Sequence, residues 1–114
     1  MNTEYLFSYG TLQLEKVQLE SFHRKLEGNP DILLGYKLGQ LKITDDSVLA
    51  KSGANYHPIA IETNNQEDMI KGILFQISIE ELKQADLYEV ADYKRIKITF
   101  RSGIEGWVYV KAQQ

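Results

Sequence analysis

The chain has 114 residues, 43% of them apolar and 25% charged, which is the balance of one globular domain spanning residues 1–114 rather than of a disordered chain. The absence of cysteine excludes structural disulfides and zinc–thiolate sites, and only two histidines argue against an all-histidine metal site. A formal net charge of -3 argues against nucleic-acid binding, no stretch is apolar for long enough to span a bilayer, and Met1–Glu4 lacks the basic start of a secretory signal, so we expect a cytoplasmic protein.

The first part of the chain predicts a strand followed by a helix. Tyr5–Tyr9 is short, rich in aromatic residues and stopped by Gly10, which is typical of a buried strand. From Leu14 to Leu26 apolar residues recur at helical spacing, and Gly28 follows as a stop signal. The apolar positions that carry this spacing are Leu19, Phe22 and Leu26.

The middle of the chain predicts two strands separated by a loop. We expect the first strand over residues 32–43, with Gly35 and Gly39 marking bends or bulges within it. The polar segment 44–55 predicts a loop. Tyr56–Ile61 then returns to strand character.

A capping box gives the clearest local pattern. A turn at Asn64–Asn65 leads into Met69–Ile77, which predicts a strand. In the four residues that follow, Ser78 and Glu81 have the spacing at which each side chain satisfies the exposed main-chain N–H group of the other. We therefore expect a helix to begin here and to end near Glu89.

The last part of the chain predicts a hairpin. Tyr93–Phe100 and Gly106–Val110 read as two strands around a turn at Ser102–Gly103. The element order is then β-α-β-β-β-α-β-β, and the short links between the late strands favour antiparallel pairing. The predicted class is α+β, with a mixed sheet curling toward a small barrel and two helices.

The segment Tyr9-Gly10-Thr11-Leu12 is the first candidate for a site, because it joins a strand to a helix. A glycine lets a ligand approach the backbone, and the N–H groups that follow it are able to hold a carboxylate or a developing oxyanion. The alternative is a tight turn in which Gly10 only supplies dihedral freedom. The segment has too few glycines for a phosphate loop or a dinucleotide fingerprint.

Glu89 is the second candidate. Ile79, Leu82 and Ala85 mark the face of the second helix that turns toward the core, and Glu89 falls seven residues after Leu82 on the same face. The negative end of the helix dipole and apolar neighbours both disfavour a charged carboxylate, which raises its pKa and suits it to exchange protons. The alternative is an exposed acid at a fraying helix end.

Polar aromatic residues and a basic run are weaker candidates. Tyrosines can wall a pocket for a small polar ligand, but they also serve as half-buried strand residues. The basic run on the first hairpin strand is interpreted as a solvated face, with Arg95 as a candidate to pair with a nearby acid. The tyrosines are Tyr9, Tyr36, Tyr56, Tyr88 and Tyr93, and the other basic residues are Lys94, Lys97 and Arg101.

Together these segments resemble the gamma-glutamylcyclotransferase family, including its small AIG2-like members, over nearly the whole chain. Tyr5–Leu12 resembles the family's opening strand and its Tyr-Gly-Ser/Thr-Leu loop, and Tyr56–Ile61 resembles its middle segment. Gly72–Ile77 resembles the strand that leads into the second helix. The segment 86–89 with Tyr93 and Arg95 resembles the Leu-Asp-x-x-Glu…Tyr-x-Arg signature, although Ala85 stands where leucine is usual.

The resemblance implies that the loop Tyr9–Leu12 and Glu89 meet in one pocket, with Tyr93 as a further substrate-binding residue. It implies that Glu89 takes a proton from the α-amine of a γ-glutamyl substrate, that this amine attacks the γ-carbonyl, and that 5-oxoproline forms as the other amine leaves. A tethered nucleophile and N–H donors aimed at the oxyanion supply the rate, so neither a metal nor an organic cofactor is expected.

The implied partner is a small γ-glutamyl molecule, with no nucleic acid and no membrane. The chain lacks the C-terminal extension of the larger relatives that act on free γ-glutamyl amino acids, so a γ-glutamyl amine or related amide is as plausible a substrate. Two alternatives stay open: a binding module that turns nothing over, and an enzyme acting on another amide.

Overall fold

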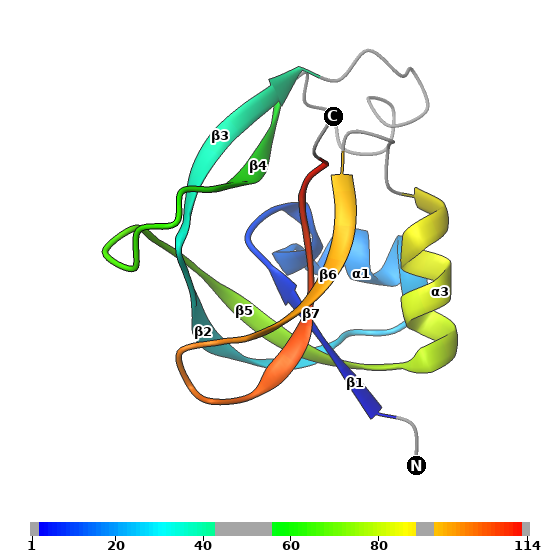
Figure 1. The fold of residues 1–114 in the computed structure, drawn as a ribbon. Helices are drawn as coiled ribbons and strands as arrows, with labels where there is room; N and C mark the ends of the chain where they lie inside the picture. The colour runs from blue at the N-terminus through cyan, green and yellow to red at the C-terminus, as the bar shows by residue number, and fades with distance from the viewer. Residues whose placement is uncertain (1–2, 43–55, 89–92, 113–114) are drawn as a thin grey trace.

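The protein, seen in a computed structural model, is described over residues 3–42, 56–88 and 93–112. Within these ranges the chain forms seven strands, a 3-10 turn and two helices (Figure 1). The strands are β1 (Thr3–Ser8), β2 (Glu27–Leu34), β3 (Tyr36–Lys42), β4 (Tyr56–Glu62), β5 (Met69–Ser78), β6 (Tyr93–Thr99) and β7 (Glu105–Lys111). The helical segments are the 3-10 turn η1 (Thr11–Gln13) and the helices α1 (Glu15–Phe22) and α3 (Ile79–Tyr88).

The sheet is mixed and curled. Its five strands follow the order β2-β5-β1-β7-β6, and the central strand β1 pairs antiparallel with β5 and parallel with β7. β3 and β4 form a separate antiparallel pair that bends away from the end of β2 (Figure 1). The predicted α+β class, the curled mixed sheet and the two helices are confirmed. Closure into a barrel is not seen among the described strands, since no backbone ladder joins β4 to β7.

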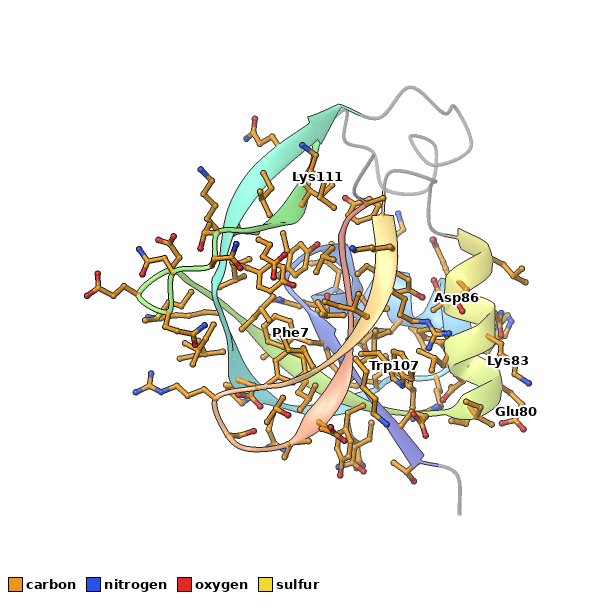
Figure 2. All side chains as sticks on the ribbon, viewed as in Figure 1. Phe7, Glu80, Lys83, Asp86, Trp107 and Lys111 are labelled. Atoms are coloured by element: carbon orange, nitrogen blue, oxygen red, sulfur yellow. The ribbon has the colours of Figure 1, made fainter. Side chains whose placement is uncertain are left out.

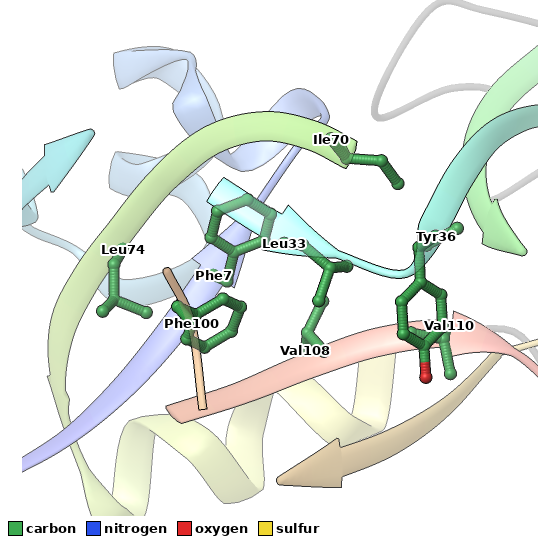
Figure 3. Packing of buried hydrophobic residues seen from close by; sticks show 9 residues of the cluster. Phe7, Leu33, Tyr36, Ile70, Leu74, Phe100, Val108 and Val110 are labelled. Atoms are coloured by element: carbon green, nitrogen blue, oxygen red, sulfur yellow. The ribbon is translucent and has the colours of Figure 1, made fainter. Parts of the chain in front are cut away.

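Alternating side chains of the sheet build two cores. Phe7 and Val108 point to one face, where they pack with residues of β3 and β4 such as Tyr36 and Ala60 (Figure 3). Leu6, the neighbour of Phe7, points to the other face, which α1 and α3 cover with residues that include Phe22, Leu82 and Ala85. Both faces of the sheet are therefore buried, as its run of apolar residues requires.

The first helix is shorter than the sequence pattern suggests. It ends at Phe22, and His23 closes it in the left-handed region with a φ of 60° and an N–H donated to the Leu19 carbonyl. The prediction of a helix up to Leu26 with Gly28 as its stop is wrong: Leu26 is buried in the link after the helix, and Gly28 lies within β2. Leu19 is 45% exposed, so the apolar spacing was partly coincidental.

The predicted strand over residues 32–43 is divided into two. Gly35 has a φ of 83°, and its N–H donates to the Asp68 carbonyl while its own carbonyl accepts from Thr63. This positive φ ends β2 and lets β3 leave the main sheet. The bend predicted at Gly35 is confirmed, whereas Gly39 lies inside β3.

The remaining elements follow the predictions closely. β4 and β5 cover the predicted strands, and the turn between them has Asn64 at a φ of 59°. The hairpin of β6 and β7 turns at 100–104, as predicted from Ser102–Gly103. The predicted loop 44–55 lies outside the described residues.

No helix in the described ranges has the length and apolar character needed to cross a membrane.

The capping box at the start of α3 is confirmed. The Ser78 N–H donates to Oε1 of Glu81 over 2.8 Å, and the Glu81 N–H donates to Oγ of Ser78 over 3.1 Å. Glu81 also accepts two hydrogen bonds from the Arg24 guanidinium, at 2.7 and 2.8 Å. One carboxylate therefore caps α3 and ties it to the segment that follows α1.

This ion pair predicts a pH dependence of stability. The hydrogen bond from Arg24 holds the pKa of Glu81 below its ordinary value of 4.5, against the opposing effect of burial. A carboxylate whose pKa is lowered by folding stabilises the protein above its unfolded pKa, and this stabilisation is lost as the pH falls through the folded pKa. We expect the free energy of unfolding to fall less in Glu81→Gln than in the wild type when the pH is lowered from neutral to below about pH 4. Urea denaturation of each protein at both pH values measures this fall. Glu80→Gln, an exposed acid in the same turn, is the control and should follow the wild type.

Candidate functional site

The parallel pairing of β1 with β7 brings the predicted loop at Tyr9–Leu12 and Tyr93 to one edge of the sheet. Leu6 lies opposite Trp107 and Phe7 opposite Val108, so the ends of both strands meet at the same edge. β6 begins there as well, because Tyr93 pairs with Lys111 at the end of β7. Residues near 9, 93 and 111 are therefore neighbours although they are far apart in the sequence.

Gly10 sits in a close contact with β4. A Cβ atom added to Gly10 would lie 3.3 Å from Cγ of Pro58, so only a glycine leaves this approach undisturbed. Its N–H donates to Oγ of Ser8 over 3.3 Å, and its carbonyl accepts from the Gln13 N–H over 3.2 Å. Gln13 Nε2 donates to the Ser8 carbonyl over 2.7 Å, which braces the turn from the other side. The turn is therefore held in one conformation.

Two main-chain N–H groups at the start of the 3-10 turn are not used by the hydrogen bonds of the turn itself. Its first bond starts at Gln13, so the N–H groups of Thr11 and Leu12 have no partner within the turn. Leu12 is half-buried against the core under the helices, and its carbonyl accepts from Nε2 of the buried Gln18 over 2.8 Å. The loop Tyr9–Leu12 is thus a braced turn whose first two main-chain N–H groups are not used by the turn's own hydrogen bonds, and an oxyanion-binding role for them stays a prediction.

Tyr9 links two strands that have no ladder between them. Its hydroxyl group donates to the Tyr109 carbonyl on β7 over 2.5 Å and accepts from the Ala60 N–H on β4 over 3.0 Å. The hydroxyl therefore joins the small sheet to the main sheet where a direct backbone bond is missing. The ring of Tyr9 packs against the core formed with Phe7.

We expect Tyr9→Phe to lower the free energy of unfolding by about 2 kcal/mol, because Ala60 is fully buried and two main-chain groups lose this partner. Urea denaturation measures the change. Tyr36→Phe is the matched control, since Tyr36 is buried in the same core and no hydrogen bond of its hydroxyl is found within the described ranges. An equal loss in both variants would contradict the linking role of the Tyr9 hydroxyl.

Tyr93 meets the Gly10 loop through Pro58. Its hydroxyl donates to the Pro58 carbonyl over 2.8 Å, and the ring of Pro58 lies on the side of Gly10 where a Cβ atom would point. The sequence did not single out Pro58 as a site residue, and it gave no role to Gln18. Gln18 is only 4% exposed and bridges the Leu12 carbonyl to the Leu26 N–H, so a polar residue on the buried side of a helix was the available signal.

Glu89 lies outside the described residues, so the meeting of Glu89 with the loop stays a prediction. The helix that leads to it behaves as expected up to Tyr88, its last described residue. Leu82 and Ala85 are buried and Ile79 packs against them, so the face on which Glu89 was counted is the face toward the core. Of the tyrosines named from the sequence, the side chains of Tyr56 and Tyr88 also lie outside the description.

Arg95 pairs with an acid, as the sequence allowed. Its Nε lies 2.9 Å from Oδ1 of Asp86, and its guanidinium carbon lies 4.3 Å from the centre of the Trp107 ring. Lys94, Lys97 and Arg101 are exposed, which confirms the solvated-face interpretation for the rest of the basic run. Lys97 also lies over Trp107, 5.5 Å from its ring centre.

The described residues contain no group of three or more histidine, cysteine, aspartate or glutamate side chains placed to hold a metal ion. A surface groove of about 450 Å³ opens at the start of β1, at the other end of that strand from Gly10, and it contains none of the candidate residues. Arg24, one of its charged lining residues, is already paired with Glu81. The groove is lined by Thr3, Arg24, Glu27, Gln76, Ile77, Ser78 and Glu80.

The family model described as gamma-glutamyl cyclotransferase, AIG2-like, matches residues 6–114. The chain belongs to this family. The match covers the Gly10 loop, Pro58, the helix α3 and Tyr93. None of the curated proteins compared with the chain matches it.

Solved structures support the cyclotransferase fold. The solution structure of At3g28950.1 from Arabidopsis thaliana has a TM-score of 0.75 at 20% identity, covering 97% of this chain and 63% of that one. The uncharacterized protein loc79017 from Homo sapiens gives 0.74 at 14% identity, covering 99% and 69%. A structure named gamma-glutamyl cyclotransferase gives 0.75 at 14% identity, covering 98% and 68%. At these identities the likeness concerns the fold, and the chain spans less than two thirds of the Arabidopsis protein.

Proposed function

We propose that the protein cyclises a γ-glutamyl amine or amide to 5-oxoproline and releases the amine. Membership of the cyclotransferase family over residues 6–114 carries the proposal. The meeting of the Gly10 loop and Tyr93 at Pro58 supports it, because it gives the family's substrate-binding loop a fixed surrounding.

In the proposed reaction, the α-amine of the γ-glutamyl group attacks the γ-carbonyl carbon. One C–N bond forms within the substrate and the amide C–N bond to the leaving amine breaks. Glu89 accepts the proton that the α-amine gives up and donates it to the departing amine, so the enzyme returns to its starting state. The N–H groups of Thr11 and Leu12 are donors suited to the oxyanion of the tetrahedral intermediate.

The protein needs little chemistry of its own for this reaction, since nucleophile and electrophile belong to one molecule. A site that holds the substrate bent, with its α-amine next to its γ-carbonyl carbon, gains most of its rate from this orientation. The bracing of the loop by Ser8, Gln13 and Gln18 serves this purpose, because loosely held N–H donors would orient the substrate less well and lower the rate.

The experiment is to incubate the purified protein with a panel of γ-glutamyl amines and γ-glutamyl amino acids and to detect 5-oxoproline. Release of the matching amine in equal amount supports the proposal. Ligands that raise the melting temperature but give no product would instead favour a binding module. Turnover of other amides without 5-oxoproline would assign the same fold to a different reaction.

A further inference from the structure

Asp86 lies in the last turn of α3 and joins this turn to the two hairpin strands. Its Oδ1 atom accepts a hydrogen bond from the Tyr109 hydroxyl over 2.7 Å and lies 2.9 Å from Nε of Arg95. Figure 2 shows Asp86 on the flank of α3 that faces these strands. One carboxylate oxygen therefore connects three elements: α3, β6 and β7.

The two donors are held independently of Asp86. Arg95 and Tyr109 are direct cross-strand partners in the β6–β7 ladder, so their side chains leave the same face of the hairpin. The Arg95 guanidinium also stacks on Trp107, and Trp107 Nε1 donates to Oε1 of Glu4 over 2.8 Å. The hairpin thus holds two hydrogen-bond donors, the Arg95 guanidinium and the Tyr109 hydroxyl, side by side. The Asp86 carboxylate binds both of them.

The same hairpin carries the candidate site. Tyr93 stands two residues before Arg95 on β6, and its hydroxyl binds Pro58. The carbonyl of Tyr109 accepts from Tyr9, the residue that precedes Gly10. Fixing the end of α3 on Arg95 and Tyr109 therefore fixes it relative to the Gly10 loop as well as to Tyr93.

We infer that Asp86 is a positioning residue: it seats the last turn of α3, the turn that precedes Glu89 in the sequence, on Arg95 and Tyr109. This inference rests on the proposed function, because Glu89 comes three residues after Asp86 in the sequence. The Asp86 side chain is 37% exposed and that of Arg95 is 24% exposed, so the pair adds little to global stability. Its contribution is geometric, and a displacement of about 1 Å is enough to cost 10²-fold in rate.

The test combines hydrogen exchange with steady-state kinetics on the whole protein. In Asp86→Ala, exchange of the amides in the last turn of α3 should quicken at least about tenfold, while kcat for 5-oxoproline formation falls about 10- to 100-fold and KM changes less than about threefold. Tyr109→Phe keeps the carbonyl that binds Tyr9 and removes only the hydroxyl, so it should show a smaller effect of the same kind. The double variant should lose less than the product of the two single losses, because both remove one shared contact.

Glu80→Gln is the matched control, since it removes one carboxylate charge from the first turn of the same helix (Figure 2). It should leave both exchange in the last turn and kcat close to the wild type. Unchanged exchange in Asp86→Ala would overturn the inference, and so would faster exchange with unchanged kcat in an active protein. If the wild type forms no 5-oxoproline from any γ-glutamyl substrate, the proposed function fails, and the exchange data still decide whether Asp86 seats the helix end.

Discussion

Replacing Glu89 by glutamine is expected to lower kcat for 5-oxoproline formation by at least about 100-fold. Glutamine keeps the size and the hydrogen-bonding shape of the side chain but cannot accept and return a proton. The α-amine would then have to lose its proton to water, and the leaving amine would have to gain one from water. KM should change little, because the loop donors of Thr11 and Leu12 are untouched.

The control is the same substitution at another glutamate. Glu80→Gln changes an exposed carboxylate in the first turn of α3 and should retain the wild-type rate. The kinetics are measured by following 5-oxoproline and the released amine together over a range of substrate concentrations. A Glu89→Gln variant with more than about a tenth of the wild-type kcat would reject the proton-transfer role.

Folding of both proteins must be compared in the same experiment. Glu89→Gln should unfold at the wild-type urea concentration and should still be stabilised by a γ-glutamyl ligand, because binding and proton transfer involve different groups. Loss of ligand stabilisation together with loss of rate would instead make Glu89 part of the binding surface.

Local signals in the sequence predicted much of the fold. The capping box of Ser78 and Glu81 located the start of α3 because both of its hydrogen bonds are made within four residues. The hairpin of β6 and β7 was equally predictable from the sequence, since its turn and its two strands are adjacent in the chain. The first helix was misjudged because its end depends on a left-handed His23, a conformation that the residue type does not announce.

The site was harder to predict because it depends on contacts between distant segments. Nothing in the Tyr9 neighbourhood reveals that its hydroxyl will lie between Ala60 and Tyr109, which are 51 and 100 residues away. Pro58 likewise gains its place only when β4 folds back toward the Gly10 loop. The pairing of Arg95 with a nearby acid was foreseen as one option, but that this acid is Asp86, and that Asp86 also binds the Tyr109 hydroxyl, was not.

Gly72 supplies the prediction with the largest effect on stability. It lies in β5 opposite the end of β1, and an added Cβ would overlap the Ser8 carbonyl oxygen and lie 2.7 Å from Cζ of Phe7. A main-chain oxygen in a paired strand cannot move aside without separating β1 from β5. We therefore expect Gly72→Ala to lower the free energy of unfolding by about 3 kcal/mol, the upper end of the usual range for overpacking.

Gly39→Ala tests whether backbone overlap is the cause. A Cβ at Gly39 would also approach too closely, at 2.6 Å, but the atom it meets is Cδ1 of Ile61, the far end of a side chain that can rotate away. Its expected cost is below about 1 kcal/mol, measured by urea denaturation beside Gly72→Ala. Equal losses would contradict the argument. Because Ser8 leads directly into Tyr9 and Gly10, Gly72→Ala should also lower kcat in the fraction that remains folded, whereas Gly39→Ala should not. The glycine in β5 thereby sets the position of the strand on which the candidate loop is mounted.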